Sequence, residues 1–313
     1  MKEETMKVFV TGGTGAIGRL VVLRLVARHE VTALARTPEK ATALAAAGAR
    51  TAEVSLFDPE QLAAAFAGHD VVLNLATAIP PPNKALQAAA WTENNRIRTE
   101  GSTAVVDAAL AAGVGQVVQE SIIFPYPDSG DRWIDEEVPL DPVAALQSTV
   151  VAESNARRFT DAGRTGVVLR FGAFYGPGSS QSDQILDAAR RHIGLAIGRP
   201  GGYISSIHVD DAAAAAVAAI GIPPGVYNVV DDDPLTKRDF ARAVGDAVDA
   251  KPWFLTPGRV ARLGGKRTAA LTRSQRVTNR RFREAAGWAP RFASAREGWA
   301  ATVAERVPEH SHA

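Results

Sequence analysis

The hydrophobic pattern of the first 170 residues alternates short apolar runs with longer amphipathic stretches. Mainly apolar runs at residues 8–10, 31–35, 70–76 and 167–170 predict strands, and the mixed stretches 51–55 and 116–121 are predicted strands as well. The stretches between them carry helix signals, since Thr37-Pro38 and Asp58-Pro59 are typical helix starts and Gly113 is a typical helix stop. Because each parallel strand crossover needs a helix, this alternation predicts an α/β fold with a doubly wound parallel sheet.

The turn between the first strand and the first helix is rich in glycine. Residues 7–19 read KVFVTGGTGAIGR, so Gly12, Gly15 and Gly18 follow a G-x-x-G-x-x-G spacing. We expect Gly12 to allow the tight turn, Gly15 to let a pyrophosphate approach the backbone, and Gly18 to let the helix pack closely. Free N–H groups at the helix start would then hold phosphates. The alternative is an ordinary turn whose glycines serve geometry alone. The predicted dinucleotide contacts of this turn are Gly12, Thr14, Gly15, Ala16, Ile17 and Gly18.

The pattern loosens after Arg170, where short elements alternate with Gly, Pro, Ser and Arg. A strand near residues 225–230 and a helix near residues 236–248 are the clearest elements there. We expect residues 1–170 to form a dinucleotide-binding Rossmann domain. Residues 171–313 are expected to form mainly a smaller, C-terminal substrate-binding lobe, with segments that return to the Rossmann sheet. The tryptophans Trp253, Trp288 and Trp299 should pack in this lobe or face a flat aromatic ligand.

Composition narrows the classes of function. The net charge of +1 gives no electrostatic argument for nucleic acid or a membrane surface as a partner. A basic run is therefore predicted to be a solvated helical face; its members are Arg259, Arg262, Lys266, Arg267, Arg273 and Arg276. The absence of cysteine excludes disulfides, cysteine nucleophiles and zinc–thiolate sites. No signal peptide is recognised, so a cytoplasmic location is expected, and the oligomeric state stays open.

A histidine–aspartate group near residue 208 is the remaining candidate for metal chemistry. His208 precedes Asp210 and Asp211, but no second histidine stands at ligand spacing, so no metal site is predicted. We expect one of the two aspartates to cap the alanine-rich helix that follows.

Motifs along nearly the whole chain resemble the extended short-chain dehydrogenase/reductase family. They are TGGTGAIG at 11–18, NLAT at 74–77, LRFGAFYGPG at 169–178, IHVDDAA at 207–213, GVYNVVDD at 225–232 and AGWAPR at 286–291. The resemblance implies an NAD(P)H-dependent oxidoreductase. It implies further cofactor contacts at Asp58, Leu75, Ala76, Thr77 and Phe171. Asp58 is also a candidate helix cap, and both roles are compatible. Gly172 and Phe174 follow the sixth strand, where a parallel sheet opens its ligand crevice, so they are assigned to the substrate pocket together with Tyr126.

The end of the second strand indicates which dinucleotide is bound. An NAD enzyme usually has Asp or Glu there to accept hydrogen bonds from the ribose 2′-OH. This chain has Ala35 followed by Arg36, and a guanidinium suits a 2′-phosphate. We therefore predict NADPH as cofactor, with NADH tolerated. The alternative is that Arg36 is only a solvated surface charge.

The catalytic pattern departs from the family. The family uses Ser or Thr together with Tyr-x-x-x-Lys, in which Tyr supplies a proton and Lys lowers its pKa. Ser121 fills the first place and is the predicted catalytic residue. Aligned on Ala152-Glu153, the Tyr place is Ala145 and the Lys place is Thr149. None of the four tyrosines has Lys four residues later, so a shift of register does not restore the pair.

Three functions remain open. The first is a ketoreductase acting on an aromatic polyketide ketone of angucyclinone type, in antibiotic biosynthesis. A ketone beside a phenol or enol hydroxyl is polarised by an internal hydrogen bond, so it needs positioning more than an enzyme acid. Water, Ser121 and Tyr126 are the other proton sources considered. The second function is an inactive NADP(H) sensor, and the third is a nucleotide-sugar epimerase or dehydratase.

Overall fold

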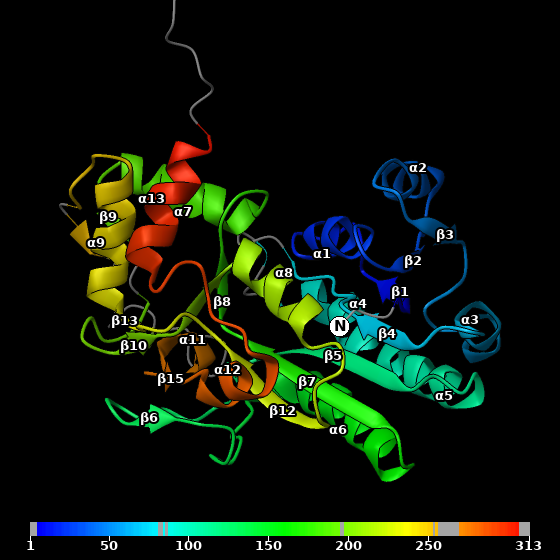
Figure 1. The fold of residues 1–313 in the computed structure, drawn as a ribbon. Coiled ribbons are helices and arrows are strands. Elements are labelled where there is room, and N and C mark those ends of the chain that lie inside the picture. The colour runs from blue at the N-terminus through cyan, green and yellow to red at the C-terminus, as the bar shows by residue number, and fades with distance from the viewer. Residues whose placement is uncertain are drawn as a thin grey trace, which may run out of the picture.

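The computed structural model describes residues 5–80, 84, 87–194, 197–252, 254–255 and 269–306. Its centre is a seven-stranded parallel sheet with the strand order β12-β7-β5-β4-β1-β2-β3 (Figure 1). The strands are β1 (Lys7–Thr11), β2 (Glu30–Leu34), β3 (Arg50–Ala52), β4 (Val71–Asn74), β5 (Gln116–Ile122), β7 (Thr165–Phe171) and β12 (Gly225–Val229). The order changes direction between β1 and β4, which is where doubly wound sheets bind ligands. The predicted α/β Rossmann fold is confirmed.

Helices cover both faces of the sheet because the strands are apolar on both sides. Within β1, Val8 and Val10 belong to one hydrophobic cluster and Phe9 to another. The first cluster includes residues of α1 (Gly18–Leu25), α2 (Pro38–Ala46), α8 (Val209–Ala218) and α12 (Arg280–Ala286). The second includes residues of α3 (Pro59–Phe66), α5 (Ser102–Ala111) and α6 (Gln147–Asp161). Two cores, one on each face, therefore hold the sheet in place.

Segments after β7 build a third core beside the sheet and also return to it. The helices α7 (Ser180–Arg190), α9 (Lys237–Ala247) and α13 (Ala295–Ala304) contribute to a cluster around Tyr175, Phe240 and Trp299. Trp299 is fully buried there, whereas Trp288 packs on Phe282 in the first cluster. Short strand pairs lie around this core: β8 (Ala173–Tyr175) with β11 (Ser206–His208), β9 (Ile193–Gly194) with β14 (Phe254–Leu255), and β10 (Tyr203–Ile204) with β13 (Leu235–Thr236).

Short elements connect the sheet to the site. After β4 the chain forms η2 (Ala88–Trp91), α4 (Thr92–Arg96) and η3 (Ile97–Gly101), the last being a π-helical turn that runs into α5. After β5 come β6 (Trp133–Ile134) and η4 (Ala144–Leu146). β6 pairs with β15 (Arg276–Val277), which follows α11 (Ala269–Thr272). π-helical turns are frequent at functional sites, so η3 marks a region of interest.

The helix starts test the sequence signals directly. Thr37 and Asp58 cap α2 and α3, because their side chains accept hydrogen bonds from backbone N–H groups of the first turn. The expected aspartate cap of α8 is wrong. His208 caps that helix by accepting from the N–H of Asp210, whose carboxylate instead pairs with Arg24 at 2.6 Å. The aspartates of this first turn are occupied by partners on other elements.

Some expectations fall outside the described residues. They concern Trp253 and the basic residues Arg259, Arg262, Lys266 and Arg267. In the part of the chain that the structure describes, no helix is long and apolar enough to cross a bilayer.

Candidate functional site

The glycine turn has the geometry that a dinucleotide needs. Gly12 has φ +71°, and a Cβ added there would lie 2.5 Å from the carbonyl oxygen of Leu75 at the end of β4. A Cβ at Gly18 would lie 2.1 Å from the carbonyl oxygen of Gly12, so the helix start packs directly on the turn. At Gly15 the nearest atom is the Gly12 carbonyl oxygen at 3.3 Å, and the residue is exposed. Gly12 and Gly18 therefore pack tightly against the protein, whereas Gly15 is accessible to a ligand.

A cavity of about 610 Å³ opens in front of this turn. Of the residues predicted to contact the cofactor, seven line it: Gly12, Thr14, Gly15, Arg36, Leu75, Ala76 and Thr77. They come from three neighbouring strand ends, those of β1, β2 and β4, so the cavity lies at the point where the strand order reverses. Its volume and its position at the glycine turn fit a dinucleotide cofactor.

Five predicted contacts do not line this cavity. Ala16 and Ile17 follow the turn, and Gly18 packs against it. The carboxylate of Asp58 accepts from the N–H groups of Glu60 and Gln61, so its cap role is present. Phe171 is fully buried in the core.

The sequence reasoning missed several residues that the fold brings to the cavity. These are Thr37, Pro38, Lys40, residues 53–57 and Ile97. Lys40 lines the same cavity as Arg36, and this proximity follows from the first turn of α2. The Arg36 side chain is 54% exposed, and its nearest carboxylate is that of Glu93 at 3.9 Å. Two cations therefore lie at the β2 end of the cavity, where Glu93 is close to Arg36 and the carboxylate of Glu53 also lines the cavity.

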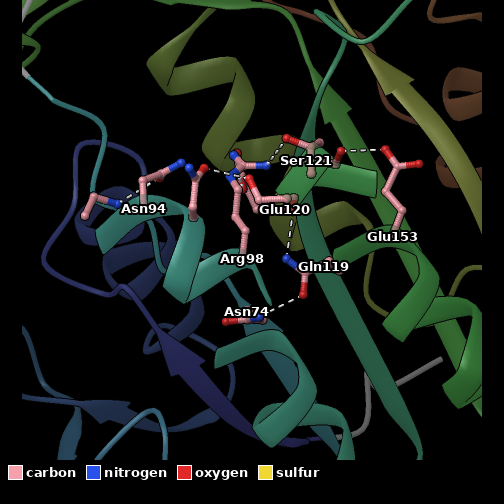
Figure 2. A network of polar contacts seen from close by, with 11 residues as sticks. Asn74, Asn94, Arg98, Gln119, Glu120, Ser121 and Glu153 are labelled. Atoms are coloured by element: carbon pink, nitrogen blue, oxygen red, sulfur yellow. Dashed lines mark hydrogen bonds and ion pairs between the residues drawn. The ribbon is translucent and has the colours of Figure 1, made fainter. Parts of the chain in front are cut away.

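The place of the family's Tyr and Lys is occupied differently. Ala145 is exposed in η4, and Thr149 is buried on α6. Thr149 accepts a hydrogen bond from Arg98 Nη1 at 3.2 Å, so a guanidinium from the π-helical turn contacts the Lys place. Both carboxylate oxygens of Glu120 lie 2.8 Å from Arg98 Nη2, and the two side chains are each 3% exposed (Figure 2). Burial raises the pKa of Glu120, and the Arg98 charge opposes that rise.

A polar chain links this ion pair to the cofactor cavity. Thr11, which lines the cavity, donates to Asn74 Oδ1 at 2.6 Å, and Asn74 donates to Gln119 Oε1 at 2.7 Å. Gln119 in turn donates to the carbonyl oxygen of Glu120 (Figure 2). All of these groups are buried and satisfied, so the network fixes the ends of β4 and β5 relative to each other.

Ser121 and Tyr126 belong to a second buried network. Ser121 donates to Glu153 Oε1 at 2.6 Å, and Arg170 binds both oxygens of the same carboxylate at 2.9 and 2.7 Å. Arg170 also donates to the Tyr126 hydroxyl at 2.7 Å, and Tyr126 donates to Asn228 Oδ1 at 3.0 Å. Burial raises the pKa of Tyr126 to about 12, with the nearby Arg170 charge acting in the opposite direction. Tyr126 is thus a weaker acid than an ordinary tyrosine, and Arg170 joins its hydroxyl to the carboxylate of Glu153.

The two other predicted substrate-pocket residues lie between the sheet and the C-terminal segments. Gly172 is buried, and a Cβ there would lie 2.9 Å from the carbonyl oxygen of Ser205. Phe174 is half-buried, with its ring 5.3 Å from that of Phe171. A larger residue at Gly172 would separate β7 from the segment that carries β11.

Together, the fold and this site define a dinucleotide-binding oxidoreductase of the Rossmann type. Residues 12–192 match the family model described as NAD(P)H-binding. The chain belongs to this family, and within it to the atypical short-chain dehydrogenase/reductases, as an NAD(P)H-dependent oxidoreductase.

Three proteins illustrate what the chain is similar to. It is 35% identical over 311 residues to a Streptomyces sp. protein named 3-diazoavenalumate denitrifying reductase, covering 94% of this chain and 99% of that one. It is 31% identical over 245 residues to 4-hydroxy-2-methyl-3-oxo-4-farnesyl-3,4-dihydroquinoline-1-oxide ketoreductase of Stigmatella aurantiaca, covering 75% and 71%. The structure of human epimerase family protein SDR39U1 with NADPH superposes with a TM-score of 0.78 at 26% identity, covering 96% of this chain and 100% of that one.

Proposed function

We propose that this chain is an NADPH-dependent reductase that delivers hydride to an aromatic small molecule without an acid at the family's Tyr position. The observation that carries the proposal is the pair Ala145 and Thr149, which replaces Tyr and Lys. The buried Tyr126 does not compensate, because its hydroxyl is already bonded to Arg170 and Asn228. The acceptor must then be one that needs little or no proton from the protein.

NADPH is the proposed cofactor because Arg36 and Lys40 line one end of the cavity. Two cations suit a 2′-phosphate, and no carboxylate at the end of β2 selects the ribose 2′-OH of NADH. When bound, NADPH supplies the hydride. The chain's own contribution is to hold the pyrophosphate at the glycine turn and to keep β4 and β5 fixed through the Thr11–Asn74–Gln119 hydrogen bonds.

The first proposed acceptor is a ketone of an aromatic polyketide, of the angucyclinone type, as in antibiotic biosynthesis. Hydride addition to its carbonyl carbon leaves an alkoxide, which takes a proton from an adjacent hydroxyl of the substrate or from water. The Stigmatella aurantiaca relative supports this choice, since its name places a hydroxyl on the ring atom next to the ketone. Gly172 and Phe174 are proposed to line the acceptor pocket. Ser121 is proposed to contact the carbonyl oxygen, for which it would have to release Glu153.

The second proposed acceptor is an aromatic diazonium ion, favoured by the Streptomyces relative. Here hydride forms a C–H bond at the ring carbon, the C–N bond breaks, and its electron pair leaves with dinitrogen. The reaction consumes no proton, so it makes the smallest demand on a site that lacks Tyr and Lys. The reductase class of the chain argues against an inactive sensor. A nucleotide-sugar epimerase is also disfavoured, because its oxidation step relies on the missing pair.

The experiment supplies NADPH and three acceptors: 8-hydroxy-1-tetralone, 1-tetralone without the hydroxyl, and 4-carboxybenzenediazonium. A reaction without protein corrects for direct reduction of the diazonium ion. We expect enzyme-dependent loss of the nicotinamide absorbance with the hydroxyketone or the diazonium ion, and little with plain 1-tetralone. Tight NADPH binding without oxidation by any of the three would overturn the proposal. Faster reduction of 1-tetralone than of its hydroxy analogue would overturn substrate-assisted protonation.

A further inference from the structure

A cation held between two aromatic rings lies outside the site described so far. The guanidinium carbon of Arg276 lies 4.2 Å from the ring centre of Trp133 and 4.8 Å from that of Tyr203. β15 and β6 pair in register at Arg276 and Trp133, and Gln275 hydrogen-bonds to the backbone of Tyr203. Figure 1 shows these short strands close to one another, beside the end of the central sheet. We call this group the Trp133–Arg276–Tyr203 stack.

Arg276 differs from Arg273 and Arg281 in having no acidic partner among the described residues. Arg273 pairs with Asp141 at 2.7 Å, and Arg281 pairs with Glu137 at 2.9 Å. Among the described residues, no carboxylate lies within ion-pair distance of Arg276, and its buried Nε has no hydrogen-bond partner. Two aromatic faces therefore orient a guanidinium whose N–H groups are not neutralised by the protein. The prediction of a solvated helical face is wrong for Arg276, which lies in a strand and stacks on rings.

The stack is attached to the edge of the sheet where the acceptor is expected. The side chain of Gln275 donates to the carbonyl oxygen of Tyr126 at 2.7 Å, just after β5 ends. The neighbouring residue Val277 packs with Ile123, also directly after β5. Carboxyl ends of parallel strands form the ligand crevice of such sheets. The strand that carries Arg276 is therefore attached to this edge of the sheet through the residues on either side of Arg276.

We infer that the Trp133–Arg276–Tyr203 stack is a binding site for the carboxylate of a flat aromatic acid. A planar guanidinium binds a carboxylate through two parallel charge-assisted hydrogen bonds. The Trp133 side chain is 49% exposed in the part of the molecule that is described, so its ring offers surface to an aromatic ligand. The inference rests on the proposed function, because it makes the reductase selective for acceptors that carry an acid group.

Equilibrium binding separates this inference from turnover. The probes are 4-hydroxycinnamate and its methyl ester, which have the same ring but differ in charge and carry no group that the proposed reaction reduces. We expect the acid to bind the wild type at least tenfold more tightly than the ester. The variant Arg276→Gln should bind the acid about ten- to hundredfold more weakly and the ester unchanged. Arg276→Lys should recover only part of the affinity, since an ammonium does not bind bidentately.

Arg281→Gln is the matched control, because this arginine also stacks on a ring, that of Tyr227, but already has Glu137 as partner. It should bind both probes like the wild type. Equal loss of both probes in Arg276→Gln, or an unaltered preference for the acid, would overturn the inference. The outcomes are distinguishable from those of the proposed function. If the wild type oxidises NADPH but Arg276→Gln binds both probes as the wild type does, the proposed function stands and the carboxylate site is rejected. If the acid binds selectively through Arg276 but no acceptor causes NADPH oxidation, the site stands and the proposed function is rejected.

Discussion

The proposed preference for NADPH is expected to depend on the exposed Arg36. Arg36→Gln removes the guanidinium at the end of β2 and leaves a shorter, neutral polar side chain. A charge-assisted hydrogen bond is worth about 1.5–3 kcal/mol, and the exposure of Arg36 lowers this to about 1–2 kcal/mol. The dissociation constant for NADPH should therefore rise about 5- to 30-fold. That for NADH should change less than about twofold, since NADH carries no 2′-phosphate.

Glu93 provides an independent check of the same contact. Its carboxylate lies 3.9 Å from Arg36 and would compete with a 2′-phosphate. Glu93→Gln should therefore tighten NADPH binding by up to about fivefold, which corresponds to an exposed ion pair of at most about 1 kcal/mol. Arg50→Gln is the control, because Arg50 pairs with Glu30 at 2.8 Å and does not line the cavity.

The assay is titration of the purified protein with each cofactor, followed by fluorescence of the reduced nicotinamide at low salt. Low salt is needed because screening weakens exposed charge pairs. An unchanged ratio of the two dissociation constants in Arg36→Gln would show that Arg36 does not bind the 2′-phosphate. The 2′-phosphate would then be held elsewhere, and Lys40→Gln would be the next variant to titrate.

Three further predictions concern stability. Gly12→Ala should cost about 1–3 kcal/mol more than Gly68→Ala, since both residues have positive φ but only Gly12 abuts a backbone carbonyl; urea unfolding of the two variants measures the difference. Arg98→Met should lower the free energy of unfolding by about 3–5 kcal/mol at pH 8, because it leaves the Glu120 carboxylate buried and unpaired. At pH 5, where this carboxyl can be neutral, the loss should be clearly smaller. An equal loss at both pH values would contradict this prediction. Burial lowers the pKa of His208 to about 4. As the pH falls below about 6.5, this histidine is therefore protonated first in the unfolded chain, which lowers the stability of the folded protein. His208→Asn keeps a cap acceptor and should remove about 2 kcal/mol of the stability loss between pH 7.5 and pH 5.

The parts of the site that lie close in sequence were predictable. The glycine turn, the end of β2 and the end of β4 each carry a local pattern, and all three line the cavity. The caps at Thr37 and Asp58 followed from single residues and their neighbours. Local patterns suffice here because a βα unit forms its turn and its helix start from consecutive residues.

The buried networks were not predictable, because their members meet only after the sheet has formed. Arg98 comes from a π-helical turn and Glu120 from β5, and nothing in either segment indicates that they pair. Ser121 matched a family position, but its hydrogen bond to Glu153 was not predicted. Glu153 served only to align the helix with the family's Tyr-x-x-x-Lys positions. No local pattern marks Trp133, because its partner Arg276 comes from a distant part of the chain.

Reduction is proposed to proceed without a proton from a tyrosine of the protein. The direct test is the turnover number of Tyr126→Phe relative to the wild type, measured with NADPH and whichever acceptor is reduced. Loss of a general acid typically costs a factor of about 10²–10⁴. We expect Tyr126→Phe to have a turnover number within about fivefold of the wild type and an unchanged affinity for NADPH. A loss of a hundredfold or more in a variant that still folds and binds NADPH would contradict it.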